Sequence, residues 1–363
     1  MPRHLISDAH EWINEIPTVP IYYLAKPHSD IDTHDTSVQA LVNSCNLNQT
    51  KLSCKIDTRL KNIVTSIEKF GEVVVESKPC EITLVRKKNK QAQIMVADLP
   101  PMSVDNIHLN LKQMVNTKGE DIRGCSLLPD GRMVFSCRGK CIVTFFNKEG
   151  VELFQYGKNR KGFRTYDALY IKEDNGVAVS SGLDGKQFIT LIDIESKTVM
   201  TIVMDAEICG MAIRGRTIYY CAWRKGLKML NLNDKSVSDI INRDMSYVIY
   251  VATFEDKLYY TNWDTQTVTC CDLQGTTQWE FKDERVLRYP LGITVDNDGN
   301  VYVIGRDSIN VVVISPDGQR HKQLLSSKDG LVTPHVLDYE RSTNKLLVVN
   351  RRDIAFLFDV SRG

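Results

Sequence analysis

The chain has no excess of charge of either sign and no long apolar run. Its 46 Lys and Arg residues nearly balance 45 Asp and Glu residues, which gives a formal net charge of +1. Any affinity for nucleic acid or an anionic membrane would therefore require an uneven distribution of charge over the surface. No stretch approaches the roughly 18 consecutive apolar residues of a membrane-spanning helix. Residues 1–17 carry His, Asp and Glu where a secretory signal needs an apolar core, and we expect a cytoplasmic protein without membrane contact.

The sequence also lacks the common signatures of metal sites and of catalysis. Its ten cysteines include no CxxC pair, and the nearest approach, Cys137 with Cys141, has no second Cys/His pair at a suitable distance. Most cysteines stand in apolar runs, and we interpret them as reduced core thiols. A GxSxG elbow, a phosphate-binding glycine loop and an HExxH motif are also absent. We therefore expect neither a metal nor a cofactor.

A repeat of four short strands runs through the C-terminal part of the chain. Its clearest copy, Pro290–Leu325, places β-branched runs on both sides of an Asn-Asp-Gly turn, a third run after a polar loop, and a fourth after Pro-Asp-Gly. The first turn recurs in six copies, near Gly131, Gly176, Gly215, Asp256, Gly299 and Thr343. An antiparallel sandwich is the alternative, but its crossover connections would not keep the spacing constant. Intervals of about 40 to 45 residues are typical of propeller blades, so the sequence predicts an all-β six-bladed β-propeller.

The last copy of the repeat is one strand short. From His335 to Val360 there is room for only three strands, and an open ring would leave an exposed edge strand. The stretch Asn106–Lys112, just before the first blade, alternates polar and apolar residues. We expect residues 106–117 to supply the fourth strand, so that the propeller occupies residues 106–363.

The region before the propeller has a different pattern. Residues 37–71 predict a short coiled-coil helix, and hence a homodimer, because mostly apolar positions step by four and three in two runs with a register shift between them. The alternative is a single amphipathic helix that packs on its own domain. We expect residues 72–105 to form a strand-rich linker and residues 1–36 an extended lead-in. The stepping positions are Val38, Val42, Cys45, Gln49 and Leu52, then Ile56, Leu60, Ile63, Ile67 and Phe70.

The fifth blade resembles a known repeat. Pro290–Asp296 followed by Asp298–Val303 is similar to the NHL repeat, and a short coiled coil ahead of six such blades resembles the C-terminal half of tripartite-motif (TRIM) proteins. TRIM proteins that act as ubiquitin ligases carry zinc-bound RING and B-box modules before the coiled coil, and this chain has no Cys/His array for either. The resemblance therefore implies a non-catalytic binding or scaffold module. The alternative is the substrate-recognition part of a TRIM-type E3 ubiquitin ligase whose RING and B-box end is absent from this chain.

One end of the predicted propeller is rich in basic residues. The loops between the second and third strands of each blade share this end with the connections between blades. Trp223 and Trp263 end second strands there, and an aromatic ring beside guanidinium groups stacks on a base or anchors a peptide. We therefore expect a protein or an RNA partner, an acidic peptide being as compatible as RNA. The alternative is that each Trp fills a gap between blades and each Arg is only solvated. The predicted partner-binding residues are Arg138, Lys140, Lys158, Arg160, Lys161, Arg164, Trp223, Arg224, Lys225, Arg243, Trp263, Arg285, Arg288, Arg306, Arg351 and Arg352.

The central channel has few side chains that could coordinate a metal ion. Propeller hydrolases hold a hard cation there between several Asp, Glu, Asn or His groups of the inner strands. At the starts of the six inner strands, only Asp167 and His335 could coordinate a metal. Two such residues are too few for a site of this kind, and we expect no enzymatic activity.

Overall fold

The computed structural model describes residues 48–55, 72–79, 103–158, 163–181, 187–245 and 248–363. They belong to two compact units, 1–94 and 95–363, each described by itself. Within the described residues, no helix is long and apolar enough to cross a membrane.

In the first unit, the structure describes one antiparallel pair of strands, β1 (Asn48–Lys55) with β2 (Glu72–Pro79). β1 lies inside the segment 37–71, for which the sequence predicts a helix, so these residues differ from the expectation. Its partner strand contains three consecutive valines, which favour extended structure. The remainder of that segment lies outside the described residues, as do the lead-in and residues 80–102. The coiled coil and the homodimer therefore stay predictions.

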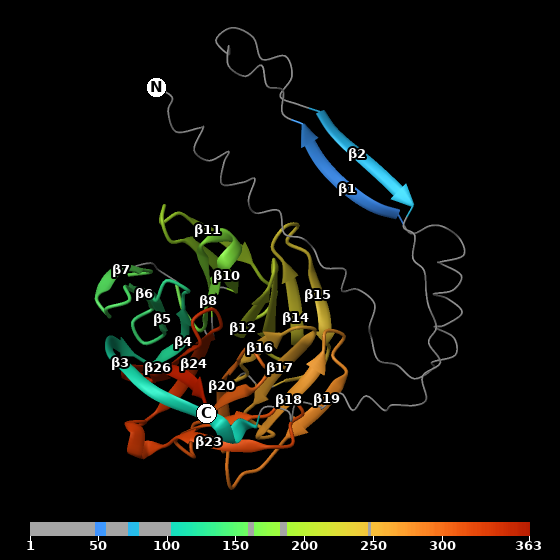
Figure 1. The fold of residues 1–363 in the computed structure, drawn as a ribbon. Helices are drawn as coiled ribbons and strands as arrows, with labels where there is room; N and C mark the ends of the chain where they lie inside the picture. Colours follow the sequence, from blue (N-terminus) through green and yellow to red (C-terminus); the bar gives the residue numbers. More distant parts are fainter. Residues whose placement is uncertain (1–47, 56–71, 80–102, 159–162, 182–186, 246–247) are drawn as a thin grey trace, which may run out of the picture. The chain divides into compact units, whose positions relative to one another are not determined.

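The second unit is a ring of six four-stranded antiparallel sheets (Figure 1). This architecture confirms the predicted all-β six-bladed propeller. In every blade, we label the strands a to d from the central axis outwards. Blades 1 to 3 comprise β4 (Ile122–Leu127), β5 (Met133–Cys137), β6 (Ile142–Phe146) and β7 (Glu152–Tyr156); β8 (Ala168–Ile171), β9 (Gly176–Ser180), β10 (Phe188–Asp193) and β11 (Val199–Val203); and β12 (Ile208–Arg214), β13 (Thr217–Ala222), β14 (Gly226–Asn231) and β15 (Val237–Ile241).

Blades 4 to 6 follow the same order, except that the outermost strand of blade 6 comes from the start of the unit. They comprise β16 (Val251–Phe254), β17 (Lys257–Asn262), β18 (Thr267–Asp272) and β19 (Thr277–Phe281); β20 (Pro290–Val295), β21 (Val301–Gly305), β22 (Asn310–Ile314) and β23 (His321–Leu325); and β24 (Pro334–Glu340), β25 (Lys345–Asn350), β26 (Arg352–Arg362) and β3 (Ile107–Glu120). Three short 3-10 helices are η2 (Val104–Asn106), η3 (Lys172–Asp174) and η4 (Ser327–Asp329).

Middle strands are buried on both faces because neighbouring blades cover them. β5, β21 and β22 are buried over their whole lengths, and they are correspondingly almost continuously apolar. Outer strands such as β7 are only partly covered and alternate in exposure. At the axis, the inner strands approach so closely that some positions need glycine. A Cβ added to Gly210 would lie 2.5 Å from the Tyr250 Cα, and one added to Gly124 would lie 2.4 Å from the Ala168 nitrogen.

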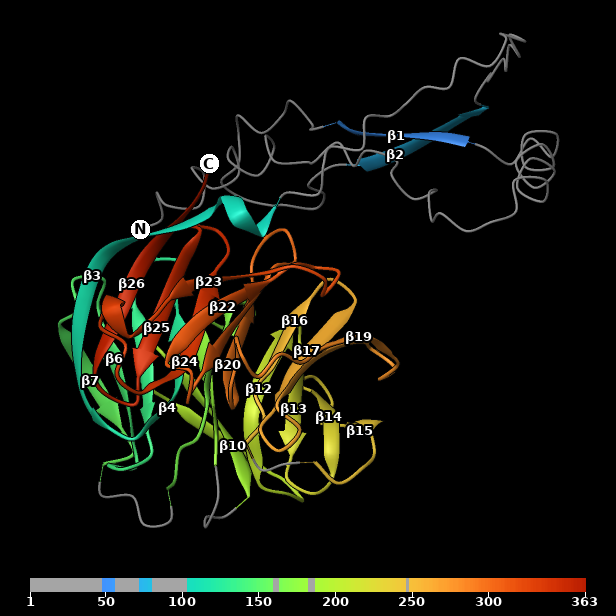
Figure 2. The ribbon, with the colours of Figure 1, turned by 90° about the horizontal axis from the view of Figure 1, so that it is seen from below.

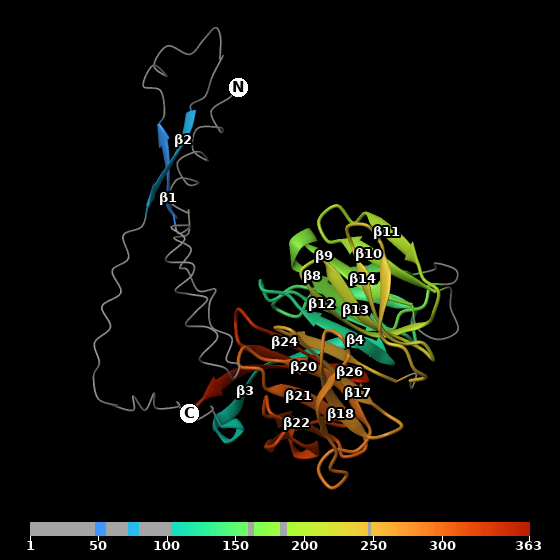
Figure 3. The same cartoon turned by 90° about the vertical axis from the view of Figure 1, so that its right-hand side faces the viewer.

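The two ends of this unit close the ring. β3 pairs antiparallel with β26 and is the fourth strand of blade 6, the role expected for residues 106–117. Figures 2 and 3 show β3 at the margin of the ring. Arg362, at the end of β26, donates from Nη2 to a carboxylate oxygen of Asp296 in blade 5 at 3.0 Å, and it also contacts Asp298. The first and last strands of the unit therefore hold one blade together and fasten it to its neighbour.

The ring has two ends with different connections. We call the end that carries the b–c loops and the d–a connections between blades the loop face, and the end that carries the a–b and c–d turns the turn face. The six repeated turns of the sequence all lie in or next to a–b turns, from Gly131 in blade 1 to Thr343 in blade 6. The register of the repeat was therefore assigned correctly in every blade.

Candidate functional site

The predicted partner-binding residues that the structure describes all lie at the loop face. Arg160 and Lys161 lie outside the described residues. The b–c loops, or the strand ends next to them, carry Arg138, Lys140, Trp223, Arg224, Lys225, Trp263, Arg306, Arg351 and Arg352. The connections between blades carry Lys158, Arg164, Arg243, Arg285 and Arg288.

Trp223 and Arg224 form a stacked pair in the b–c loop of blade 3. The Trp223 backbone nitrogen donates to the Glu207 carbonyl at 2.9 Å, which ties the backbone at the end of β13 to the connection before β12. Arg224 has φ = 58°, and its guanidinium carbon lies 4.8 Å from the centre of the Trp223 ring. Trp223 is half-buried, whereas Arg224 is exposed. The pair therefore presents a guanidinium group, held over an aromatic ring, to solvent.

A second stack joins three loops of blades 4 and 5. Trp263 follows β17, and its ring centre lies 4.5 Å from that of Tyr289 and 5.0 Å from the guanidinium carbon of Arg306. Arg243 lies between the two stacks in sequence, in the connection from blade 3 to blade 4, and donates to the Tyr260 hydroxyl at 2.9 Å. We call the set of Trp223, Arg224, Arg243, Trp263, Tyr289 and Arg306 the aromatic arc. It extends over three successive blades of the loop face.

Counter-charges reduce the positive surplus that the sequence predicts. Arg285 chelates Asp283 with distances of 3.0 and 2.9 Å, Lys225 pairs with Asp205 at 3.0 Å, and Arg351 pairs with Asp121 at 2.6 Å. These three cations therefore have their charge partly neutralised. All three aspartates lie outside the b–c loops: Asp205 and Asp283 are in connections between blades, and Asp121 lies between β3 and β4.

Other basic side chains of this face differ in how far they are engaged. Lys140 donates to the Lys118 carbonyl at 2.7 Å and lies 3.7 Å from Glu120, and Arg288 donates to the Asp307 carbonyl at 3.1 Å. Lys158, Arg164 and Arg352 are exposed and have no ion-pair partner among the residues that the structure describes. Among the described residues, the loop face therefore carries some cations that are paired or hydrogen-bonded and some that have no ion-pair partner. It is not a continuous positive surface.

A cluster of Arg123, Tyr250 and His335 lies at the starts of the inner strands, toward the loop face. Arg123 Nη1 lies 3.3 Å from His335 Nε2, and the Tyr250 hydroxyl donates to the Arg123 carbonyl at 2.7 Å. A guanidinium group only donates, so Nε2 of His335 accepts this bond. Burial and the charge of Arg123 lower the pKa of His335 well below its usual value. The lone pair of Nε2, which a metal ion would need, is therefore already used within the protein.

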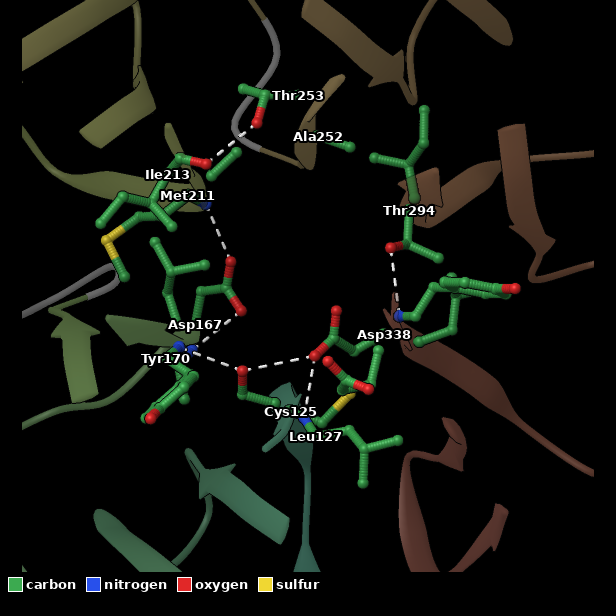
Figure 4. Close-up of a pocket in the computed structure, with 18 of the residues that line it drawn as sticks. Cys125, Leu127, Asp167, Tyr170, Met211, Ile213, Ala252, Thr253, Thr294 and Asp338 are labelled. Carbon is green, nitrogen blue, oxygen red and sulfur yellow. Dashed lines mark hydrogen bonds between the residues drawn. The ribbon is translucent and has the colours of Figure 1, made fainter. Parts of the chain in front are cut away.

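Below this cluster, the channel widens into a cavity of about 250 Å³, to which all six inner strands contribute. Figure 4 shows Asp167 and Asp338 on its wall. The two carboxylate oxygens of Asp167 accept from the backbone nitrogens of Ala168 and Met211, each at 2.8 Å. Oδ2 of Asp338 accepts from the Leu127 nitrogen at 2.8 Å and from the Ser126 hydroxyl at 3.3 Å.

Both carboxyl groups of the cavity hold their protons more tightly than usual. Burial, assisted by the charge of Asp338, raises the pKa of Asp167 to about 7, although the two backbone donors act in the opposite direction. Burial also raises the pKa of Asp338. The sequence analysis missed Asp338 because it compared only the starts of the inner strands, and this residue stands further along β24 in the run His335–Glu340. Among the described residues, no three His, Cys, Asp or Glu side chains converge in a way that could hold a metal ion.

Comparison with known proteins shows the fold alone. No protein-family model matches the chain, and no curated protein does, so these comparisons give no support to the resemblance to TRIM proteins or to the NHL repeat. A protein of unknown function from Bacteroides thetaiotaomicron matches with a TM-score of 0.56 and 12% identity, over 70% of this chain and 76% of its own. Virginiamycin B lyase from Staphylococcus aureus matches with a TM-score of 0.50 and 15% identity, over 68% and 87% of the two chains. A chain of a nidogen/laminin complex matches with a TM-score of 0.54 and 10% identity, over 64% and 97%.

Proposed function

We propose that this chain is a non-catalytic binding module whose loop face recognises an acidic segment of a protein partner. The aromatic arc carries this proposal. Half-buried Trp and exposed Arg side chains are the residue types that contribute most to binding at protein interfaces, and here they occur together on three successive blades. A propeller of similar fold is part of a nidogen/laminin complex, which is consistent with protein recognition by this architecture.

The arrangement of the cations favours a carboxylate-bearing peptide over RNA. A guanidinium group stacked on indole can still direct its N–H edge outward, and this edge matches a carboxylate in a bidentate geometry. Arg306 also lies 3.9 Å from Asp307, so its charge is partly balanced. Base stacking, in contrast, requires an open aromatic face, and the ring of Trp263 is already in contact with Arg306 and Tyr289. Carboxylates such as Asp205, Asp264 and Asp283 are interspersed with the cations, which disfavours a continuous phosphate backbone.

Charge reversal at the aromatic arc tests the proposal. We expect the triple variant R224E/R243E/R306E to lose binding to acidic peptides selected from a random-peptide display library, because attraction becomes repulsion at three positions. The matched control is K148E/K197E/K235E, three exposed lysines in c–d turns of the opposite face. Binding is measured by surface plasmon resonance, and circular dichroism checks that both variants are folded. We expect the control to bind like the wild type.

Two outcomes would contradict the proposal. One is peptide binding that survives the triple reversal, because the contact surface would then lie elsewhere. The other is a failure to select any acidic peptide together with tight binding of single-stranded RNA, whose affinity would fall with salt by about one unit of log-log slope for each phosphate contact. Truncation of the anchor provides a further check: W263A should lose about 2 kcal/mol or more of binding free energy in a correctly folded protein.

A further inference from the structure

The channel cavity is a pocket that the proposed binding module does not use. Its wall includes exposed residues of the a–b turns, Pro129 and Lys172, so it opens toward the turn face. At the other end of the channel lies the cluster of Arg123, Tyr250 and His335. A ligand in this cavity would therefore contact the inner strands and the a–b turns that follow them.

Two acidic side chains face the inside of this pocket without a cationic partner. Asp167 is 6% exposed, and neither it nor Asp338 forms an ion pair within the described ranges. Oδ2 of Asp338 receives both of its donors from blade 1, and its other oxygen points toward the middle of the cavity (Figure 4). The thiol of Cys125, which is 5% exposed, lines the same space and makes no hydrogen bond in the described structure. A buried carboxylate is costly unless it is paired, so a cation that enters the pocket would be stabilised beside these two groups.

The one guanidinium group on the wall forms no ion pair with either carboxyl group in the described structure, although its charge favours the ionised form of Asp338. Arg341 donates from Nε to the Val295 carbonyl at 3.1 Å and from Nη2 to the Thr253 carbonyl at 2.5 Å. Its donors are therefore directed at the backbone of blades 4 and 5. Lys172 stands at the rim, where its ammonium group is exposed to solvent.

The remaining wall mixes polar and apolar side chains, and the cavity is small, which limits the kind of ligand. Met211, Ile213, Ala252 and Ile293 contribute to the lining, and a volume of about 250 Å³ holds a molecule of about ten non-hydrogen atoms. A calcium ion would need six or more oxygen ligands, and the oxygens of Asp167 already accept backbone N–H groups. An ammonium group has three donors and needs only a few acceptors.

We propose that this cavity binds a small organic amine, whose ammonium group lies between Asp167 and Asp338 and whose short apolar body contacts the inner strands. The site is separate from the aromatic arc and does not depend on the function proposed for it. A ligand of this size should bind with a Kd of about 10 µM to 1 mM.

Isothermal titration calorimetry with defined probes tests the inference. The probes are 2-phenylethylamine, n-hexylamine and their uncharged counterparts 2-phenylethanol and 1-hexanol, at a pH at which Asp167 is ionised. We expect the amines to bind and the alcohols to bind at least about tenfold more weakly, because hydrogen bonds to a charged group are lost. Magnesium and calcium chloride are titrated in parallel and should give no heat of binding.

Two variants test whether the amine binds inside the cavity. In D338N, the amide oxygen can keep the hydrogen bonds from Leu127 and Ser126, while the uncharged NH2 group replaces the oxygen that faces the pocket. The affinity for amines should therefore fall at least about tenfold. In A252L, the added side chain occupies the cavity, and binding should be lost without a change in charge. The control D256N removes an exposed carboxylate of an a–b turn on the same face and should bind like the wild type.

Several results would overturn the inference. They are the absence of binding by either amine, equal affinity for amine and alcohol, and an unchanged affinity in D338N. Binding of magnesium or calcium that D338N abolishes would identify a metal site in place of an amine site. If D338N does not fold, the comparison of amine with alcohol on the wild type and the A252L result still decide the matter.

Discussion

At the residue scale, polar side chains of the inner strands join neighbouring blades. Asp167 of blade 2 accepts from the Met211 nitrogen of blade 3, and Asp338 of blade 6 accepts from the Leu127 nitrogen of blade 1. Each of these backbone donors belongs to an inner strand, which has no further strand on the side of the axis. A carboxylate that satisfies such a donor replaces a missing ladder bond. The same residue types can therefore serve structure and ligand binding at once.

Asp167 should make stability depend on pH in the direction opposite to that of an ion-paired carboxylate. Burial raises its pKa in the folded protein to about 7, from an ordinary value of 3.8, so the folded chain binds the proton more tightly than the unfolded chain. Its contribution to stability is complete below the unfolded pKa and is lost as the pH rises through the folded pKa. We expect D167N to gain free energy of unfolding relative to the wild type between about pH 4 and pH 7, by up to about 4 kcal/mol.

Urea unfolding of both proteins at a series of pH values measures this difference. D167N also loses one backbone hydrogen bond, which shifts its stability by an amount that does not depend on pH. D256N, which changes an exposed aspartate, should remain parallel to the wild type. A difference between D167N and the wild type that stays constant over the whole range would show that Asp167 does not titrate in this way.

At the scale of elements, one arginine of blade 6 pairs with a buried carboxylate of blade 5. Asp296 is fully buried at the end of β20, and Arg362 of β26 is its charged partner. R362A should lower the free energy of unfolding by about 2 kcal/mol, since a buried carboxylate loses a charged donor but keeps Asn300 and Tyr302. K112A, which removes an exposed pair with Asp359, should change it by less than about 0.5 kcal/mol. Guanidinium chloride unfolding compares the variants, and equal small losses would refute the role of Arg362.

The sequence could predict the blades because their signals are local. The a–b turn of blade 5, Asn-Asp-Gly, and the apolar strands on both sides of it form one continuous stretch. Ion pairs across the loop face could not be predicted in this way. Arg351 and Asp121 are far apart in the sequence and meet only because the ring closes. The contact of Trp263 with Tyr289 and Arg306 likewise depends on how two blades pack. Trp263 and Arg306 could be chosen from the sequence, but Tyr289 and the contact itself could not.

At the scale of the whole molecule, the ring should unfold as one cooperative unit. Each blade buries its faces against two neighbours, so unfolding of one blade exposes the next. The pairing of β3 with β26 joins the first and last strands of the unit. Three of the four Trp residues report on regions far along the ring from β3: Trp223 is in blade 3, and Trp263 and Trp279 are in blade 4. Their fluorescence therefore shows whether damage at the closing strand reaches the opposite blades.

Val115, on β3, is the position for this test. Its side chain is 2% exposed and pairs opposite Ala355, so V115N places an amide in an apolar site at the closing strand. With Trp12 replaced by Phe in both proteins, we expect V115N to lower the melting temperature by about 5 °C or more. The midpoint by Trp fluorescence should fall as far as the midpoint by circular dichroism. The contrary result is a fluorescence midpoint equal to that of the protein that keeps Val115, together with a lower circular dichroism midpoint. Blades 3 and 4 would then unfold independently of the closing strand, because the destabilisation of blade 6 would not have reached them.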